Sequence, residues 1–189
     1  MKQIIAIGGE PATGKTTLMN LLISRLGGNQ SFKKFSYGRL KGMFSVKENI
    51  LIFGLYDGQM FSGTDRLSMA VMPDAVKFME SEHIGNEFKD TVMIFEGDRL
   101  FNVRFLLTCR KVAPTAIMVL ETSQETKDQR HIKRGDNQSE GWLRGRKTKI
   151  KNILEQVPDV QLFKNETEME LSKNAFSVLA LAGRKNSHS

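Results

Sequence analysis

The stretch Gly9-Glu10-Pro11-Ala12-Thr13-Gly14-Lys15-Thr16 decides the fold of this chain. It matches G-x-x-x-x-G-K-T, the P-loop pattern, in which loop N–H groups and a helix N-terminus surround a phosphate. The apolar run 4–7 before it predicts a buried strand, and residues 17–26 after it have helical spacing until Gly27-Gly28 ends the helix. Strand, loop and helix together predict a site for a nucleoside triphosphate with magnesium.

Two residues of the motif have expected chemical roles. Lys15 is expected to reach the β- and γ-phosphates, and the Thr16 hydroxyl is expected to ligate Mg²⁺. The motif leaves open whether the phosphate passes to water, to a small molecule or to a polymer. The residues expected to bind the nucleotide are Gly9, Ala12, Thr13, Gly14, Lys15, Thr16 and Thr17, joined by Arg130 and Asn165 from later in the chain.

Length and composition restrict the class of protein. A chain of 189 residues with 40% apolar residues is expected to form a single domain over 1–189. One cysteine, Cys109, excludes an internal disulfide, and the lack of a long apolar run argues against a membrane span, so a cytoplasmic location is expected. The net charge of +7 and the pI near 9.6 favour polyanionic partners without identifying one.

Apolar runs and helical patterns alternate along the chain. This alternation predicts an α/β fold of the three-layer P-loop NTPase type, with a mostly parallel sheet, helices on both faces and a basic helical lid. In such sheets ligands bind beyond the carboxyl ends of the strands, so polar residues there are candidate site residues. Strands are predicted at 3–8, 32–37, 42–46, 50–56, 91–95, 115–121 and 160–163, and further helices at 73–82, 99–112, 124–134, 140–156 and 167–183.

Three carboxylates follow predicted strands or loops near this edge. Asp57 is either a general base for an attacking hydroxyl or the first residue of an Asp-Gly turn. Asp65 is a second candidate base or holds the acceptor, and its neighbour Arg66 is a candidate for binding a phosphate; the alternative is a helix cap with a solvated arginine. Glu96 ends the strand 91–95, where a Walker-B-like carboxylate would hold Mg²⁺; the alternative is a loop of solvated charges.

Residues 124–151 carry a strong basic pattern. Arg130 and Arg134 are four residues apart and share a helix face, which predicts a lid over the triphosphate; a solvated basic face is the alternative. The cations after Trp142 exceed what one triphosphate needs, so some are predicted to contact an acceptor backbone. These cations are Arg144, Arg146, Lys147, Lys149 and Lys151.

Further residues are assigned to the acceptor and to the base of the nucleotide. Tyr56 and Trp142 either stack on a base or pack in the core. Asn165, after the last strand, either lines the adenine pocket or belongs to a helix cap. The residues predicted to bind the acceptor are Tyr56, Asp98, Arg99, Arg146 and Lys147.

The P-loop, the basic segment 124–151 and Asn165 resemble the P-loop kinase superfamily of adenylate kinase-like and polynucleotide kinase-like enzymes. Four segments (35–39, 50–58, 63–68 and 95–99) resemble bacteriophage kinases of thymidine hypermodification. That resemblance implies ATP and Mg²⁺ as cofactors and transfer of the γ-phosphate to the hydroxymethyl group of 5-hydroxymethyluridine in DNA.

In the polynucleotide kinase-like branch, an aspartate and an arginine after the second strand act on the acceptor hydroxyl. By position, the resemblance assigns these roles to Asp57 or Asp65 and to Arg66, without deciding between the two aspartates. Two other classes compete with a DNA kinase. A small-molecule nucleoside or nucleotide kinase explains size and fold equally well, and a P-loop ATPase or switch is weakened because no N-K-x-D guanine signature is found.

Overall fold

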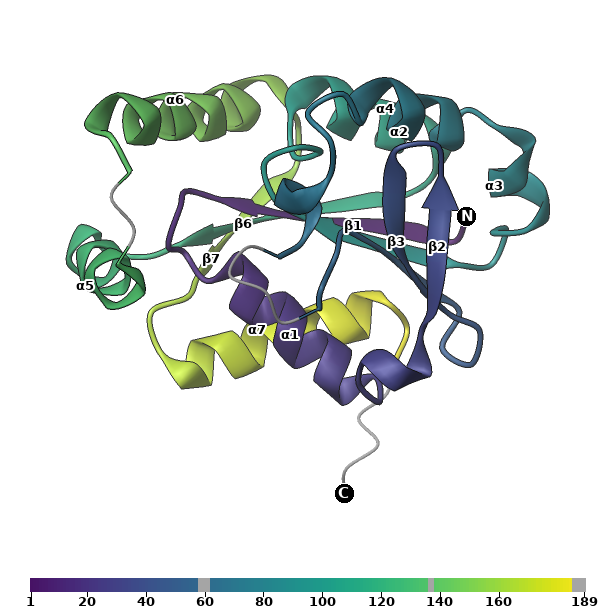
Figure 1. Ribbon diagram of the computed structural model, residues 1–189, viewed down its shortest axis with the longest axis horizontal. Helices are drawn as coiled ribbons and strands as arrows, with labels where there is room; N and C mark the ends of the chain where they lie inside the picture. Colours follow the sequence, from purple (N-terminus) through teal and green to yellow (C-terminus); the bar gives the residue numbers. More distant parts are fainter. Residues whose placement is uncertain (58–61, 136–137, 185–189) are drawn as a thin grey trace.

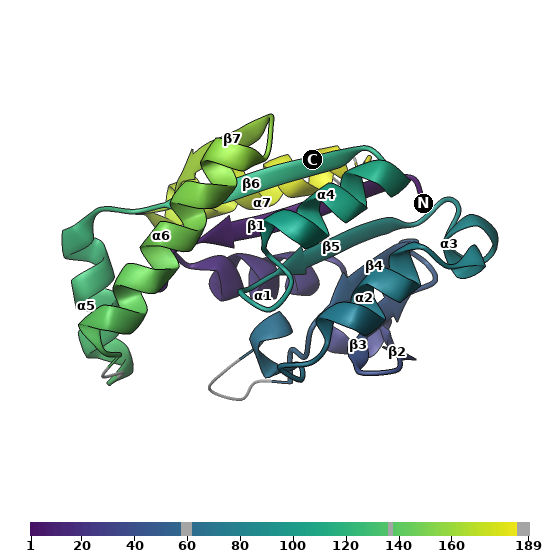
Figure 2. The ribbon, with the colours of Figure 1, turned by 90° about the horizontal axis from the view of Figure 1, so that it is seen from above.

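The computed structural model describes residues 1–57, 62–135 and 138–184 and shows one twisted sheet between two layers of helices (Figures 1 and 2). The strands are β1 (Gln3–Gly9), β2 (Lys33–Tyr37), β3 (Leu40–Ser45), β4 (Ile50–Phe53), β5 (Val92–Glu96), β6 (Thr115–Glu121) and β7 (Val160–Lys164). Their order is β2-β3-β4-β5-β1-β6-β7, in which β4 to β7 run parallel and the β2–β3 hairpin is antiparallel. The prediction of a mostly parallel α/β sheet is therefore confirmed.

The helices cover both faces of this sheet. Figure 1 shows α1 (Lys15–Arg25) and α7 (Glu168–Leu181) below it, and α2 (Met72–Met79), α4 (Val103–Val112) and α6 (Glu140–Gln156) above it. The short α3 (Glu82–Asn86) follows α2, and α5 (Gln124–Arg134) lies beyond the end of β6. Short 3₁₀ turns span Asn29–Ser31 and Thr64–Arg66. No helix within the described ranges combines the length and apolar character that crossing a bilayer requires.

The alternation of side chains along β1 divides the core into two halves. Ile4 and Ala6 pack toward the α2, α4 and α6 face, whereas Ile5 and Ile7 pack toward α1 and α7. All four side chains are fully buried, as expected for the central strand of a sheet covered on both faces. The central position of β1 brings the P-loop, which follows it, to the middle of the carboxyl edge.

Several element boundaries differ from the sequence-based predictions. The strand predicted at 50–56 stops at Phe53, because Gly54 has a φ of 113° and Leu55 forms an isolated antiparallel bridge to Gly63. The second hairpin strand begins at Leu40 instead of 42. The helix predicted at 73–82 is interrupted, since α2 ends at Met79 and α3 starts at Glu82.

The helix predicted at 99–112 begins only at Val103. Asn102 is its N-cap, and its Oδ1 accepts a hydrogen bond of 3.1 Å from the main-chain N–H of Phe105. Residues before the cap therefore form a loop at the end of β5, which adds them to the carboxyl edge of the sheet. The capping box predicted at Thr167 and Glu170 is confirmed.

Candidate active site

The P-loop connects β1 to α1 through residues with positive φ. The φ values are 142° at Gly9, 61° at Ala12 and 89° at Gly14. A Cβ atom at Gly14 would lie 2.5 Å from the Nδ2 atom of Asn165, and one at Gly9 would lie 2.6 Å from the main-chain oxygen of Leu120. Both positions therefore require glycine for conformation and for space.

Asn165 holds the P-loop from the side of β7. Its Nδ2 donates to the main-chain oxygen of Thr13 at 2.7 Å, and its Oδ1 accepts from Asn174 at 3.1 Å. The side chain is only 2% exposed. Asn165 was predicted to contact the nucleotide, but the structure directs its side chain at the loop, so it positions the binding site.

Lys15, at the start of α1, points back over the loop. Its Nζ donates to the main-chain oxygens of Gly9 at 3.0 Å and Glu10 at 2.8 Å. The carboxylate of Glu10 is paired with Lys127 of α5 at 2.9 Å. Lys127 therefore balances the one acidic side chain in a loop whose shape suits an anion.

Arg130 connects α5 to the P-loop and to the loop after β7. Its guanidinium donates to the main-chain oxygens of Ala12 at 2.9 Å, Asn165 at 2.9 Å and Glu166 at 3.1 Å. Arg130 thus lies beside the P-loop, and its predicted binding of the nucleotide and action on the transferred phosphate stay predictions. The side chain of Arg134 lies outside the described part of the chain.

Glu96, at the end of β5, lies under the first turn of α1. It is 1% exposed, and the hydroxyl of Thr16 donates to its Oε1 at 3.3 Å. Burial is the main reason that the pKa of Glu96 is raised to about 7, against the opposing charge of Lys15. Hydroxyl and carboxylate oxygens are ligands that suit Mg²⁺, so Thr16 and Glu96 fit the predicted metal site.

Tyr56 occupies a different place from the one predicted. It is 4% exposed and packs among the residues on the α1 side of the sheet. Its hydroxyl donates to Oε1 of Glu96 at 3.5 Å, and burial raises the pKa of the phenol well above its usual value. A buried ring cannot stack on an acceptor, so the prediction that Tyr56 binds the acceptor is wrong. The Tyr56 hydroxyl instead donates a hydrogen bond to Glu96.

A cleft of about 670 Å³ opens above these residues. Its first part, which we call the P-loop half, is formed by the loop and the first turns of α1: Gly8, Gly9, Pro11, Ala12, Gly14, Lys15, Thr16, Thr17 and Asn20. Its second part, which we call the rim half, is formed by Ser62, Asp65, Met69, Gly97, Asp98, Arg99, Phe101, Gln138, Trp142, Arg146 and Ile150. The rim half thus combines residues from three distant stretches of sequence, 62–69, 97–101 and 138–150.

The structure separates the two candidate aspartates. Asp65 lines the rim half, and its Oδ1 accepts a hydrogen bond of 2.7 Å from the main-chain N–H of Asp98. The preceding Thr64 donates to the main-chain oxygen of Glu96 at 2.7 Å, so this 3₁₀ turn is attached to the end of β5. Asp57 is not among the residues that line the cleft and is paired with Arg66.

An ion-pair cluster connects the rim to α6. Asp98 is paired with Arg146, and Lys149 donates to its Oδ1 at 2.7 Å and to its main-chain oxygen at 2.6 Å. Burial, followed by the charge of Arg146, lowers the pKa of Lys149 to about 8. Of the predicted acceptor residues, Asp98, Arg99 and Arg146 line the cleft, whereas Lys147 is exposed and does not.

The predicted lid, 124–151, consists of α5 and most of α6. α5 is attached to the P-loop through Lys127 and Arg130. α6 is anchored beyond the predicted lid by Ile153, which is fully buried against the α4 side of the core. Both ends of the lid segment are therefore held by the body of the protein, and its motion stays a prediction.

Sequence reasoning did not identify several residues of this site. Lys127 was recognised only as a member of a basic stretch. Lys149 was listed among the cations predicted to contact an acceptor backbone, but its pairing with Asp98 was not predicted. Phe101, Met69 and Gln138 line the cleft without any pattern in the sequence that indicates it. They reach the site only through the folding of their loops.

The comparisons with known proteins agree with this geometry. The sequence model of a family described as P-loop Nucleotide Kinase3 matches residues 1–165. The chain therefore belongs to this family of P-loop nucleotide kinases, and its class of activity is that of a P-loop phosphotransferase. The family match implies a nucleotide substrate. A comparison with curated proteins found no match.

Among solved structures, a gluconokinase from Sinorhizobium meliloti 1021 has a similar fold. The TM-score is 0.54 at 13% sequence identity, and the alignment covers 96% of this chain and 94% of the gluconokinase. At this identity the likeness concerns the fold alone. It extends over nearly the whole of both chains.

Proposed function

We propose that this protein is an ATP-dependent kinase that transfers the γ-phosphate to a hydroxyl group held in the rim half of the cleft. The observation that carries the proposal is the position of Asp65. Its carboxylate lines the same cleft as Lys15 and Thr16 but comes from a different loop. A carboxylate opposite the P-loop is suited to take the proton of an attacking alcohol.

Different residues of the cleft bind the triphosphate, stabilise the developing charge and accept the proton of the attacking hydroxyl. The P-loop half holds the triphosphate, and Lys15 stabilises the charge that develops on the transferred phosphoryl group. Mg²⁺, held by Thr16 and Glu96, would supply a positive charge to the phosphate oxygens when bound. The acceptor oxygen forms a bond to the γ-phosphorus, its proton goes to Asp65, and the bond from the γ-phosphorus to the β–γ bridging oxygen breaks to release ADP.

For the acceptor, we propose the hydroxymethyl group of a hydroxymethylated pyrimidine in DNA, 5-hydroxymethyluridine first, as in bacteriophage DNA. The rim half offers apolar and aromatic surface for a base through Met69 and Trp142, which are both exposed. On α6, next to these residues, Arg144, Lys147 and Lys151 are exposed, which suits contact with a phosphate backbone. A base in a duplex would have to be extruded to enter the cleft.

The second candidate acceptor is a free nucleotide. The observation that favours it is the pair of arginines in the rim half, Arg99 and Arg146, which suit binding of a terminal phosphate. The family description as nucleotide kinases is consistent with this acceptor as well. Both candidates use the same P-loop half and differ only in what occupies the rim half.

Transfer of label from γ-labelled ATP separates these acceptors. Four acceptors are offered at equal concentration: an oligonucleotide with one 5-hydroxymethyluridine, its thymine counterpart, the free 5-hydroxymethyluridine monophosphate and thymidylate. Label in the modified oligonucleotide alone is the expected result, because thymine has no hydroxyl for the γ-phosphate. A higher kcat/KM for either free nucleotide would contradict the DNA acceptor, and label in none of the four would contradict both. The Lys15→Ala variant gives the background.

A further inference from the structure

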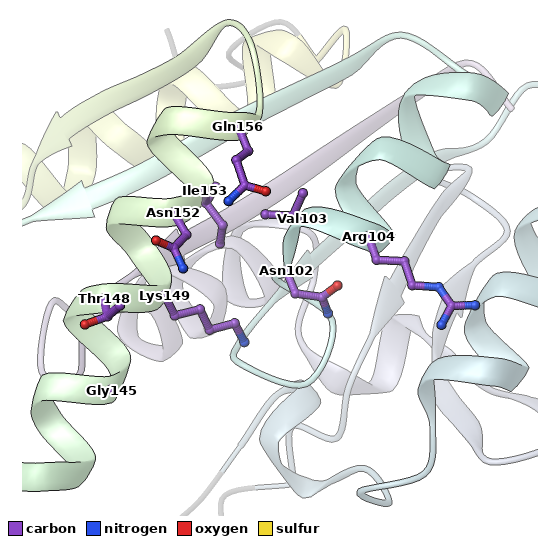
Figure 3. A pocket seen from close by; sticks show the side chains of 9 residues that line it. All are labelled: Asn102, Val103, Arg104, Gly145, Thr148, Lys149, Asn152, Ile153 and Gln156. Atoms are coloured by element: carbon purple, nitrogen blue, oxygen red, sulfur yellow. The ribbon is translucent and has the colours of Figure 1, made fainter.

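A second hollow, of about 450 Å³, lies between the start of α4 and one side of α6. Figure 3 shows Lys149 extending from α6 toward Asn102, with the amide of Asn152 on the same helix nearby, whereas Arg104 extends from α4 away from α6. The remaining lining residues are Val103, Gly145, Thr148, Ile153 and Gln156. The lining thus contains two cations and no carboxylate.

This hollow adjoins the rim half of the cleft. The segment after β5 contributes Gly97, Asp98, Arg99 and Phe101 to the cleft and Asn102, Val103 and Arg104 to the hollow. α6 contributes Arg146 and Ile150 to the cleft and the neighbouring Lys149 and Asn152 to the hollow. The bridge from Lys149 to Asp98 lies between the two.

Part of the polar lining of the hollow is available to a ligand. Within the described residues, the side chains of Arg104, Asn152 and Gln156 form no hydrogen bond or ion pair. Lys149 is bound to Asp98, and the side chains of Asn102 and Thr148 are also hydrogen-bonded within the protein. Arginine, asparagine and glutamine side chains are common partners of phosphate and sugar oxygens in DNA complexes. No carboxylate belongs to the lining, and the carboxylate of Asp98 at its boundary is paired with Lys149 and Arg146.

We propose that this hollow binds the sugar–phosphate backbone of the DNA strand beside the acceptor base. The proposal rests on the proposed function, since it assumes that the acceptor base occupies the adjoining rim half. A strand whose base enters the cleft must continue on one side of it. The hollow offers polar space at that place, lined by the amides of Asn152 and Gln156, at the boundary that α6 and the segment after β5 share.

Two substitutions in the hollow test the proposal, each with a matched control. Asn152→Asp introduces a negative charge at constant size, and Gln161→Glu makes the same kind of change on the exposed side of β7. Arg104→Ala removes a cation from α4, and Lys111→Ala removes an exposed cation from the same helix outside the hollow. None of these residues lines the catalytic cleft.

Two measurements are made on each full-length variant. The first is binding of an unmodified oligonucleotide by fluorescence anisotropy over a range of salt concentrations. The second is the steady-state kinetics of label transfer to the 5-hydroxymethyluridine oligonucleotide. Asn152→Asp is expected to raise Kd and KM for DNA about tenfold, because like charges repel, and to leave kcat and the KM for ATP unchanged. Arg104→Ala is expected to reduce the slope of log Kd against log salt by about one.

The outcomes separate this proposal from the proposed function. If the modified oligonucleotide is phosphorylated but the hollow variants behave as their controls, the hollow does not bind the backbone and the DNA kinase stands. If hollow variants weaken DNA binding and the controls do not, the hollow proposal is supported. If the wild-type protein binds no oligonucleotide, the hollow proposal is overturned, and label in a free nucleotide then overturns the DNA acceptor too.

Discussion

The two halves of the cleft are built in different ways. In the P-loop half, main-chain oxygens accept hydrogen bonds from Lys15, Arg130 and Asn165, and the loop lies between β1, α5 and β7. In the rim half, the principal contacts are charge pairs between side chains, such as Asp98 with Arg146 and Lys149. The P-loop half is thus held mainly through main-chain groups, whereas the rim half adds ion pairs between side chains to its main-chain contacts.

This difference has a physical consequence. Contacts to buried main-chain groups are fixed by the fold, because an unpaired buried group costs free energy. Ion pairs between partly exposed side chains contribute about 0–1 kcal/mol each and rearrange readily when a charged ligand enters. The P-loop half is therefore expected to be preformed, and the rim half is expected to reorganise around its acceptor.

The largest effect is expected at the centre of the P-loop half. Lys15→Ala should lower kcat about 10²–10³-fold, because this lysine stabilises charge that forms in the transition state. The matched control, Lys47→Ala, removes a lysine on the exposed surface of the protein and should leave kcat unchanged. Turnover and melting temperature are measured for both. Wild-type turnover in Lys15→Ala would remove the P-loop from the mechanism.

The second prediction concerns the protonation of Glu96, whose carboxylate accepts a hydrogen bond from Thr16 of the P-loop half. The pKa of Glu96 is raised to about 7, from 4.5 in an unfolded chain. Between these values the native state holds a proton that the unfolded state has released, so the free energy of unfolding falls as the pH rises from 4.5 to 7. The contribution of Glu96 is constant below and above this window. The loss in the nucleotide-free protein is at most about 3 kcal/mol.

Glu96→Gln removes this titration and keeps the size of the side chain. The variant should lose the stability difference between pH 5 and pH 8, and at pH 8 it should be more stable than the wild-type protein without magnesium. It should also lose most of its kinase activity, because an amide is a weaker ligand for Mg²⁺. Urea unfolding at both pH values is the measurement. An unchanged pH dependence in Glu96→Gln would show that another group causes it.

A smaller effect is expected at the boundary of the P-loop half. Arg130→Ala removes three hydrogen bonds to the main chain of the P-loop and of the loop after β7, so it should raise the Kd for ATP about tenfold. Arg144→Ala, an exposed arginine of α6, is the control. Titration calorimetry with ATP and the measured kcat are compared. A loss in kcat that far exceeds the loss in binding would instead support the predicted action of Arg130 on the phosphate.

The contrast between the halves also explains what the sequence could predict. The P-loop is contiguous, so its pattern predicted Lys15 and Thr16, and the apolar strand before Glu96 predicted a carboxylate at the same edge. These predictions depend on local order along the chain. The fold class was predictable for the same reason, because strands and helices alternate with clear periodicity.

The rim half was not predictable in the same detail. Tyr56, the last residue of the predicted strand 50–56, was predicted either to stack on a base or to pack in the core. β4 ends at Phe53, and the ring is buried in the core. The choice between Asp57 and Asp65 depends on how the loop between them folds back through the bridge from Leu55 to Gly63. Tertiary contacts such as this bridge decide the positions of the two aspartates, and no local sequence pattern predicts such contacts.

The measurement that tests this account most directly compares Asp65→Asn with Asp57→Asn. Both changes remove a carboxylate at constant size, and only Asp65 lines the cleft. Single-turnover transfer of the γ-phosphate to the 5-hydroxymethyluridine oligonucleotide is measured together with the Kd for ATP. A loss of about 10²–10⁴-fold in rate for Asp65→Asn, with unchanged ATP binding and a near wild-type rate for Asp57→Asn, is predicted. A wild-type rate in Asp65→Asn would contradict the account.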